Sequence, residues 1–251
     1  MNDLLNKKYN LELEVLTPLH VGAGQEKDWM KGADYIEDGN KIYILNHKKI
    51  AKEISANELS NFLVEKNDEG LKNKISRSLE EVSYKVFEKT ASTDNDIKTF
   101  IKNGLTNKPI VPGSSIKGAI RSILLNYFID NPNNIDRRDK RFEEKVFGSP
   151  NNGDEFMRFI KIADAQFDKT ELVNTKIFNL YKDDNNFNGG WKKSGKQTNA
   201  NFDATGFNTI YEVIKPSETG ELSIALSDKA FDNFYKTSKP EKKNEILHSE
   251  P

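Results

Sequence analysis

The sequence predicts an α+β protein, and three stretches carry this prediction. Residues 10–15 alternate polar and apolar side chains, the period of two expected for a strand with one buried face. Residues 34–45 form two apolar runs around Asp38-Gly39, a pattern typical of a β-hairpin. Residues 116–127 place Ile, Leu and Tyr at the spacing of an amphipathic helix. No internal repeat or clear linker interrupts the chain, so we expect one domain over residues 1–251, with insertions.

Two insertions are expected in this domain. The first is helical and covers about 46–108, where Asn46 can cap a short helix and a longer helix is expected over about 71–88. The second is the largest irregular segment, about 183–208, which is rich in Asn, Gly and Lys. Loops of this length are usually either functional or disordered.

Composition limits the possible functions. The chain has 251 residues, a net charge of −1 and 31% charged residues, so any site for a polyanion must be a local cluster of Lys and Arg. The absence of cysteine excludes disulfides, thiolate zinc sites and cysteine nucleophiles. The N-terminal residues lack the apolar core of a signal peptide, and no run approaches the roughly 18 apolar residues of a membrane span. We therefore expect a soluble cytoplasmic protein with no membrane partner.

The stretch 109–128 has the features of a phosphate site. Prolines and Gly113 end an extended segment, and Ser114 or Ser115 can cap the helix that follows. Lys117 and Arg121 are four residues apart and share one helix face. Free N–H groups, the helix dipole and two cations would together attract a phosphate. A glycine turn before a core helix with two solvated cations explains the same residues equally well, because one glycine-rich loop is a weak signal.

Sharper catalytic motifs are missing from the sequence. Gly118 is followed by Ala119 and not by the Lys of a nucleoside-triphosphate P-loop, and Lys117 replaces the second glycine of a hydrolase elbow. The three histidines are scattered, and no spacing singles out a metal site or a pair of catalytic carboxylates. We therefore expect no cofactor, no metal and no catalytic residue.

Two further groups of residues could have a functional role. His20 lies just before Gly22 and Gly24, although a lone histidine is more often a structural hydrogen-bonding residue. The irregular segment carries a tryptophan next to lysines, which suits a nucleic-acid strand because lysine contacts phosphate and an aromatic ring contacts a base. A disordered insert explains that composition slightly better. The residues concerned are Trp191, Lys192, Lys193 and Lys196.

Several stretches together resemble the RAMP superfamily of CRISPR effector proteins. They are 11–24, the glycine-rich loop and helix start at 110–121, and Val146-Phe-Gly148 followed by 159–165. The hairpin at 34–45 and the stretch 211–216 resemble, more narrowly, the Csm-type capping subunit of type III-A complexes. That subunit usually continues into a second RAMP-like half. This sequence stops at Pro251, so we expect a truncated, split or shorter relative.

The resemblance implies a ferredoxin-like core, similar to an RNA-recognition motif, with helical and loop insertions. It implies that the protein binds guide RNA near the 3′ end and caps a filament of related RAMP subunits, where target RNA pairs with the guide. It also implies a role in guide maturation and assembly during antiviral defence. The segment 183–208 would be a thumb-like hairpin wedged into the guide–target duplex, and His20, Gly22 and Gly24 would border the surface that holds the guide. By position, the guide backbone would contact Gly113, Ser114, Ser115, Lys117, Gly118 and Arg121.

Two alternative functions remain open at this point. Related backbone subunits cut target RNA with an aspartate in the loop after the first strand, and Asp28 lies in the comparable region here. An isolated aspartate in a polar loop is far more often solvated than catalytic. The second alternative is a subunit that mainly binds neighbouring proteins and contacts RNA weakly.

Overall fold

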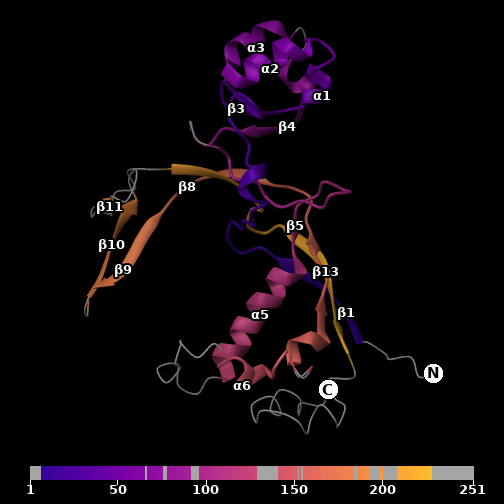
Figure 1. Ribbon diagram of the computed structural model, residues 1–251, viewed down its shortest axis with the longest axis vertical. Coiled ribbons are helices and arrows are strands. Elements are labelled where there is room, and N and C mark those ends of the chain that lie inside the picture. The colour runs from indigo at the N-terminus through magenta and orange to yellow at the C-terminus, as the bar shows by residue number, and fades with distance from the viewer. Residues whose placement is uncertain are drawn as a thin grey trace, which may run out of the picture. The chain divides into compact units, whose positions relative to one another are not determined.

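The computed structural model separates into two compact units, each built from discontinuous parts of the chain (Figure 1). The first unit comprises Met1–Glu14, Ile110–Asp168 and Glu218–Pro251, and the second comprises Val15–Pro109 and Lys169–Ser217. One RAMP-like domain over 1–251 stays a prediction. The residues that the structure describes are 7–65, 67–75, 78–91, 96–128, 141–151, 153, 155–183, 186–192, 198–199 and 208–227.

An antiparallel sheet forms the centre of the first unit. The long strands β1 and β13 pair over their full length, with Tyr9 opposite Ile224 and Leu11 opposite Leu222. β13 also pairs with β6 and β7, and β7 pairs with β5. The strands are β1 (Lys7–Glu14), β5 (Ile110–Val111), β6 (Ile160–Ile162), β7 (Ala165–Gln166) and β13 (Thr219–Leu226).

The strand predicted at 10–15 forms, but its burial differs from the prediction. β1 begins at Lys7, and Tyr9 and Leu11 are each 45% exposed. Among the described strands, β1 pairs only with β13, so it forms an edge of the sheet. Along the predicted alternation, Leu11 is exposed, Leu13 is half-buried and Val15 is buried, so the buried face forms only at the end of the stretch.

Helix α5 (Gly113–Phe128) packs on the hydrophobic core of this unit, which includes residues of α6 (Glu144–Phe147) and of a 3₁₀ helix (Phe156–Phe159). The predicted apolar stripe is only partly correct. Ile120 and Leu124 contact the core, whereas Ile123 and Tyr127 are 68% and 79% exposed. The apolar stripe of α5 is therefore wider than the part of the helix that the described residues bury.

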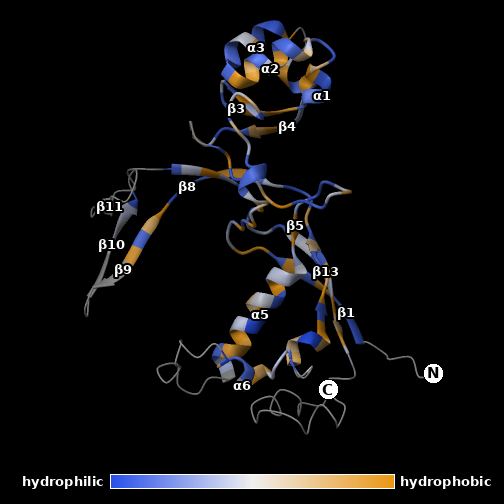
Figure 2. Ribbon diagram, viewed as in Figure 1, coloured by the Kyte–Doolittle hydropathy of each residue, from blue (hydrophilic) through white to orange (hydrophobic). Residues whose placement is uncertain are grey.

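In the second unit, a three-stranded sheet lies next to a group of short helices that carry both hydrophilic and hydrophobic residues (Figure 2). The predicted hairpin at 34–45 is confirmed, and Gly39 adopts the positive φ of 54° that its turn requires. Asn46 caps α1 as predicted, because its side chain accepts a hydrogen bond from the Lys49 N–H. The elements are β2 (Tyr35–Asp38), β3 (Lys41–Leu45), β4 (Ser83–Glu88), α1 (His47–Ile50), α2 (Ala56–Glu65), α3 (Asp68–Lys74) and α4 (Leu79–Val82).

The single long helix predicted over 71–88 is wrong. α3 ends at Lys74, a capping box between Ser78 and Glu81 starts α4, and β4 follows at once. β4 pairs with β3 and buries Phe87 in the core. Tertiary pairing with a distant strand therefore overrides the helical spacing of the apolar residues. Within the range 46–108, the helices occupy 47–82.

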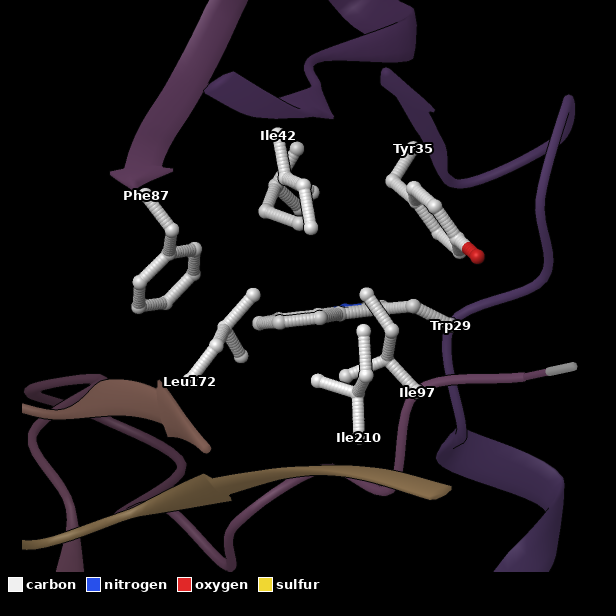
Figure 3. Packing of buried hydrophobic residues seen from close by; sticks show 8 residues of the cluster. Trp29, Tyr35, Ile42, Phe87, Ile97, Leu172 and Ile210 are labelled. Carbon is white, nitrogen blue, oxygen red and sulfur yellow. The ribbon is translucent and has the colours of Figure 1, made fainter. Parts of the chain in front are cut away.

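The core of the second unit closes around Trp29. Figure 3 shows the indole lying flat between Tyr35, Ile42 and Phe87 on one side and Ile97, Leu172 and Ile210 on the other. Leu172 and Ile210 come from β8 (Glu171–Lys176) and β12 (Asn208–Val213), which pair with each other. Trp29 thus fixes the polar loop 17–34 against the sheet.

The segment 183–208 is more regular than the sequence indicated. β9 (Phe178–Asp183) and β10 (Asn186–Lys192) form an antiparallel hairpin, and β11 (Thr198–Asn199) pairs with β10. The expected irregular segment is therefore corrected to a hairpin over its described part. No helix among the described residues is long and apolar enough to cross a bilayer.

Candidate nucleic-acid interface

Helix α5 starts differently from the sequence prediction. Neither Ser114 nor Ser115 caps it, because the helix already begins at Gly113 and both serines lie exposed in its first turn. The Gly113 N–H instead donates to Oδ1 of Asp164, at 2.8 Å. The carbonyl of Pro112 accepts from the next turn, at 2.9 Å from the Ser115 nitrogen. A carboxylate 51 residues further along the chain therefore caps this helix.

This cap changes the electrostatics of the predicted phosphate site. The Asp164 charge is favourable at the positive end of the helix dipole. It also uses the Gly113 N–H and places a negative charge where a phosphate would approach. Any RNA phosphate must therefore contact the exposed side of the first turns, where Ser114, Ser115 and Gly118 lie.

Gly113 and Gly118 have different reasons to be glycine. A Cβ on Gly113 would lie 2.1 Å from the carbonyl oxygen of Ile162, so the β6 backbone occupies the space of a side chain. Gly113 shows no positive φ, and turn freedom is therefore not its role. A Cβ on Gly118 would meet nothing within 4 Å. The backbone at Gly118 is open to a close-approaching ligand.

The two cations of α5 both bind inside the first unit. Lys117 Nζ donates to the carbonyl of Ile160, at 2.9 Å. Arg121 pairs with Glu143 at 2.9 Å and with Glu155, and its guanidinium lies 4.4 Å from the centroid of the Phe147 ring.

These contacts give both cations a structural role. Burial lowers the pKa of Arg121, but its hydrogen bonds and charge interactions with the two glutamates outweigh burial and raise that pKa. The predicted guide-backbone contacts of Lys117 and Arg121 stay predictions.

The loop with His20 belongs to the second unit. His20 Nδ1 is 2.8 Å from the carbonyl oxygen of Glu212, and its ring packs edge-on against Tyr211 and Phe100. Gly24 has a φ of 110°, so it requires glycine, whereas a Cβ on Gly22 would meet only His20 at 3.4 Å. The geometry gives His20 a structural role, and RNA contact by this loop stays a prediction.

Asp28 is held in an ion pair. Its Oδ2 lies 2.6 Å from Lys98 Nζ, its Oδ1 accepts from the Thr99 N–H at 3.3 Å, and its side chain is 7% exposed. The Asp28 carboxylate therefore holds its own loop against residues 98 and 99. In the part of the chain that the structure describes, no group of three or more His, Asp or Glu side chains could hold a metal ion.

Sequence reasoning missed the buried centre of the second unit, Glu212. This fully buried carboxylate binds Lys102 at 2.8 Å, Lys85 at 3.4 Å and the hydroxyl of Thr170 at 2.6 Å, and it accepts from the Phe100 N–H at 3.0 Å. Burial raises its pKa, but the Lys102 charge and these hydrogen bonds outweigh burial, so the pKa of Glu212 lies below its ordinary value. The available signal was an acid inside the apolar run Ile210–Ile214.

The β9–β10 hairpin presents apolar side chains on one face. Phe178 lies opposite Trp191, with ring centroids 5.1 Å apart in an edge-to-face arrangement. Leu180 lies opposite Gly189, shares that face and is 66% exposed. Of the predicted contact residues here, Trp191 and Lys192 are described, and Lys193 and Lys196 lie outside the described residues. Phe178 and Leu180 were not predicted, although their alternation with Asn179 was a signal.

Comparison with known proteins identifies the family. The model of the RAMP superfamily matches residues 12–249. The chain belongs to the RAMP superfamily. Two curated RAMP relatives are CRISPR system Cms protein Csm5 from Streptococcus thermophilus and from Methanocaldococcus jannaschii. The first is 24% identical over 197 residues, covering 66% of this chain and 54% of the relative. The second is 26% identical over 197 residues, covering 68% and 46%. This RAMP chain spans about half the length of these relatives.

Solved structures show the same fold. The crystal structure of T. onnurineus Csm5 matches with a TM-score of 0.59 and 18% identity, covering 87% of this chain and 68% of that one. A chain of the cryo-EM structure of the Csm–crRNA–target RNA ternary complex of a type III-A CRISPR-Cas system matches with a TM-score of 0.62 and 20% identity. That match covers 97% of this RAMP chain and 69% of the other.

Proposed function

We propose that this RAMP protein is a non-catalytic, guide-RNA-binding subunit of a type III CRISPR effector complex. It caps the filament near the 3′ end of the guide and aids guide maturation and assembly in antiviral defence. Its partners are the guide RNA, target RNA and other RAMP subunits. The observation that carries the proposal is the match of the family model to residues 12–249, together with the Csm5 relatives.

The first unit supports a ferredoxin-like core for this function. β1, α5, β6 and β13 occur in this order along the chain, with the short elements β5, α6 and β7 between them, and the order β-α-β-β is the one that begins a ferredoxin-like βαββαβ fold. β13 lies between β1 and β6, so the three strands form one antiparallel sheet. RNA-recognition motifs use such a sheet as a platform, which makes this unit a suitable scaffold for a guide.

The β9–β10 hairpin is the element that meets the RNA duplex in this proposal. Its exposed Phe178 and Leu180 and its half-buried Trp191 can stack on or wedge between bases, and Lys192 can reach a phosphate. On α5, the exposed Gly118 allows a backbone phosphate to approach closely. These contacts require no base sequence, which suits a subunit that must accept many different guides.

The state of Asp28 supports a subunit that does not cut RNA. A catalytic carboxylate must reach its substrate or a metal, whereas the side chain of Asp28 is 7% exposed and bound to Lys98 and the Thr99 N–H. The endoribonuclease alternative therefore requires this ion pair to open.

The test compares guide binding by the unmodified chain with that of two variants, Leu180→Ala and Phe178→Ala. Both should weaken guide binding. Leu180→Ala should leave the melting temperature nearly unchanged because Leu180 is 66% exposed, whereas Phe178→Ala should lower it slightly because it removes the ring contact with Trp191. Val64→Ala is the matched control, since Val64 is 80% exposed elsewhere in the second unit.

Two outcomes would favour the alternative functions. No guide binding by the unmodified chain, with partner subunits retained, would favour the protein-interaction alternative. The exposed Ile123 and Tyr127 of α5 are the surface such a subunit would use. Loss of a target cut only in an Asp28→Ala complex with normal guide occupancy would favour the endoribonuclease.

A further inference from the structure

A cavity of about 290 Å³ opens in the second unit, next to the loop that carries the predicted contact residues Gly22 and Gly24. Three segments line it: the loop around Ala23 and Lys27, the start of β4 at Tyr84, and residues 99–107. We propose that this cavity binds one unpaired nucleotide of an RNA strand. The proposal rests on the RNA-binding function above and adds a separate site to it.

The aromatic wall of the cavity is rigid and partly open. Trp29 lies at its base, fixed by the core residues around it (Figure 3). Tyr84 lines the same cavity and is 51% exposed. An exposed aromatic ring is the feature on which an unstacked base packs, independently of base identity. The volume lies near the lower end of the roughly 300–1,000 Å³ typical of ligand pockets, which suits one base.

The charge of the cavity suits a phosphate. Lys102 lies 4.8 Å from the Trp29 ring centroid and pairs with Glu212, which Lys85 also contacts. Lys102 and Lys27 both line the cavity, and Lys102 shares the Glu212 carboxylate with Lys85. No acidic side chain lines the cavity. Lys27, exposed at the rim, forms no ion pair within the described ranges.

Polar groups in the cavity can hold the edge of a base. Asn103 Oδ1 accepts from the Leu105 and Thr106 N–H groups, which fixes the side chain and leaves its NH₂ for a ligand. Asn107 adopts a φ of 55°, and its side-chain amide has no partner among the described residues. Amide groups next to a ring are how proteins recognise an unpaired base. These amides distinguish the cavity from a site for an acidic peptide, which the charge alone would also attract.

The experiment measures binding of a fluorescent single-stranded RNA to the full chain. Tyr84→Ala should weaken binding roughly 5- to 140-fold, the range for one base–aromatic stack, whereas Tyr84→Phe keeps the ring and should retain most of the affinity. Lys27→Ala should reduce the slope of log affinity against log salt by about 0.7, one phosphate contact to a single strand. Lys52→Ala is the matched control, because Lys52 is exposed on the helical part of the same unit. Melting curves of each variant check that it is folded.

A second measurement locates the base. RNA that contains 4-thiouridine is irradiated with the protein, and the crosslinked peptides are identified by mass spectrometry. Crosslinks in the peptides around Tyr84 and residues 99–107 support the site. If the unmodified chain binds RNA but folded Tyr84→Ala binds equally well, without crosslinks there, the cavity is not a nucleotide site and the proposed function still stands. If Tyr84→Ala instead reduces retention of a partner subunit only, the cavity is a protein contact. If the unmodified chain binds no RNA, the proposed function itself fails, and this site fails with it.

Discussion

Replacing Gly113 by alanine tests whether the start of α5 is packed as the structure shows. The added Cβ would lie 2.1 Å from the Ile162 carbonyl oxygen, whereas ordinary contacts begin at 3.4 Å. The helix or β6 must therefore move by about 1.3 Å. Overpacking of this kind costs about 1–3 kcal/mol. Movement would also stretch the hydrogen bond between Asp164 and the Gly113 N–H.

The assay is thermal unfolding of the two single variants, Gly113→Ala and Gly118→Ala. For a chain of this size, each kcal/mol shifts the melting temperature by about 2–4 °C, so Gly113→Ala should lower it by about 2–12 °C. Gly118→Ala enters open space in the same helix and should stabilise it by up to about 1 kcal/mol. Equal stabilisation by both variants would refute the close packing of α5 on β6.

Three further predictions concern the polar contacts. Arg121→Ala should lower the free energy of unfolding, measured by urea titration, by about 1.5–3 kcal/mol, because Glu155 loses a charged partner. Lys117→Ala should lower it by less, and equal decreases for the two variants would contradict this ranking. Asp28→Asn should lower stability without changing the target-cleavage products of the complex, and a lost cut at normal guide occupancy would contradict it. The pKa of Glu212 is lowered in the folded state from its ordinary value of 4.5, so its contribution to stability is present above about pH 4.5 and is lost as the pH falls through the folded-state pKa. Glu212→Gln should flatten that part of a pH–stability profile, and a profile unchanged by the substitution would contradict the assignment.

Local signals in the sequence predicted the elements that depend on neighbouring residues. The β2–β3 hairpin follows from apolar runs around Asp38-Gly39, and the start of α1 follows from the side chain of Asn46. The helix expected over 71–88 failed for the opposite reason. Its second half pairs with β3, about 40 residues earlier, and no local spacing reveals that partner.

The candidate sites show the same limit. The sequence correctly indicated that Gly113 matters. The physical reason is that the β6 backbone at Ile162, 49 positions further along the chain, leaves no room for a Cβ. Lys117 and Arg121 looked free for phosphate because Ile160, Glu143 and Glu155 are distant in the chain. Sequence alone cannot show which cations are already paired inside the fold, and it cannot place a buried acid such as Glu212 at the centre of two lysines.

The most direct test of the proposed function places a photoreactive nucleotide in the guide RNA, either at its 3′ end or at its 5′ end. The effector complex is assembled with this chain and each guide, irradiated, and the crosslinks to this chain are mapped by mass spectrometry. A capping subunit near the 3′ end should crosslink strongly with the 3′-labelled guide, including the β9–β10 peptide that contains Trp191, and weakly with the 5′-labelled guide. Equal crosslinking from both ends, or none from the 3′ end while the chain remains in the complex, would contradict the proposed position.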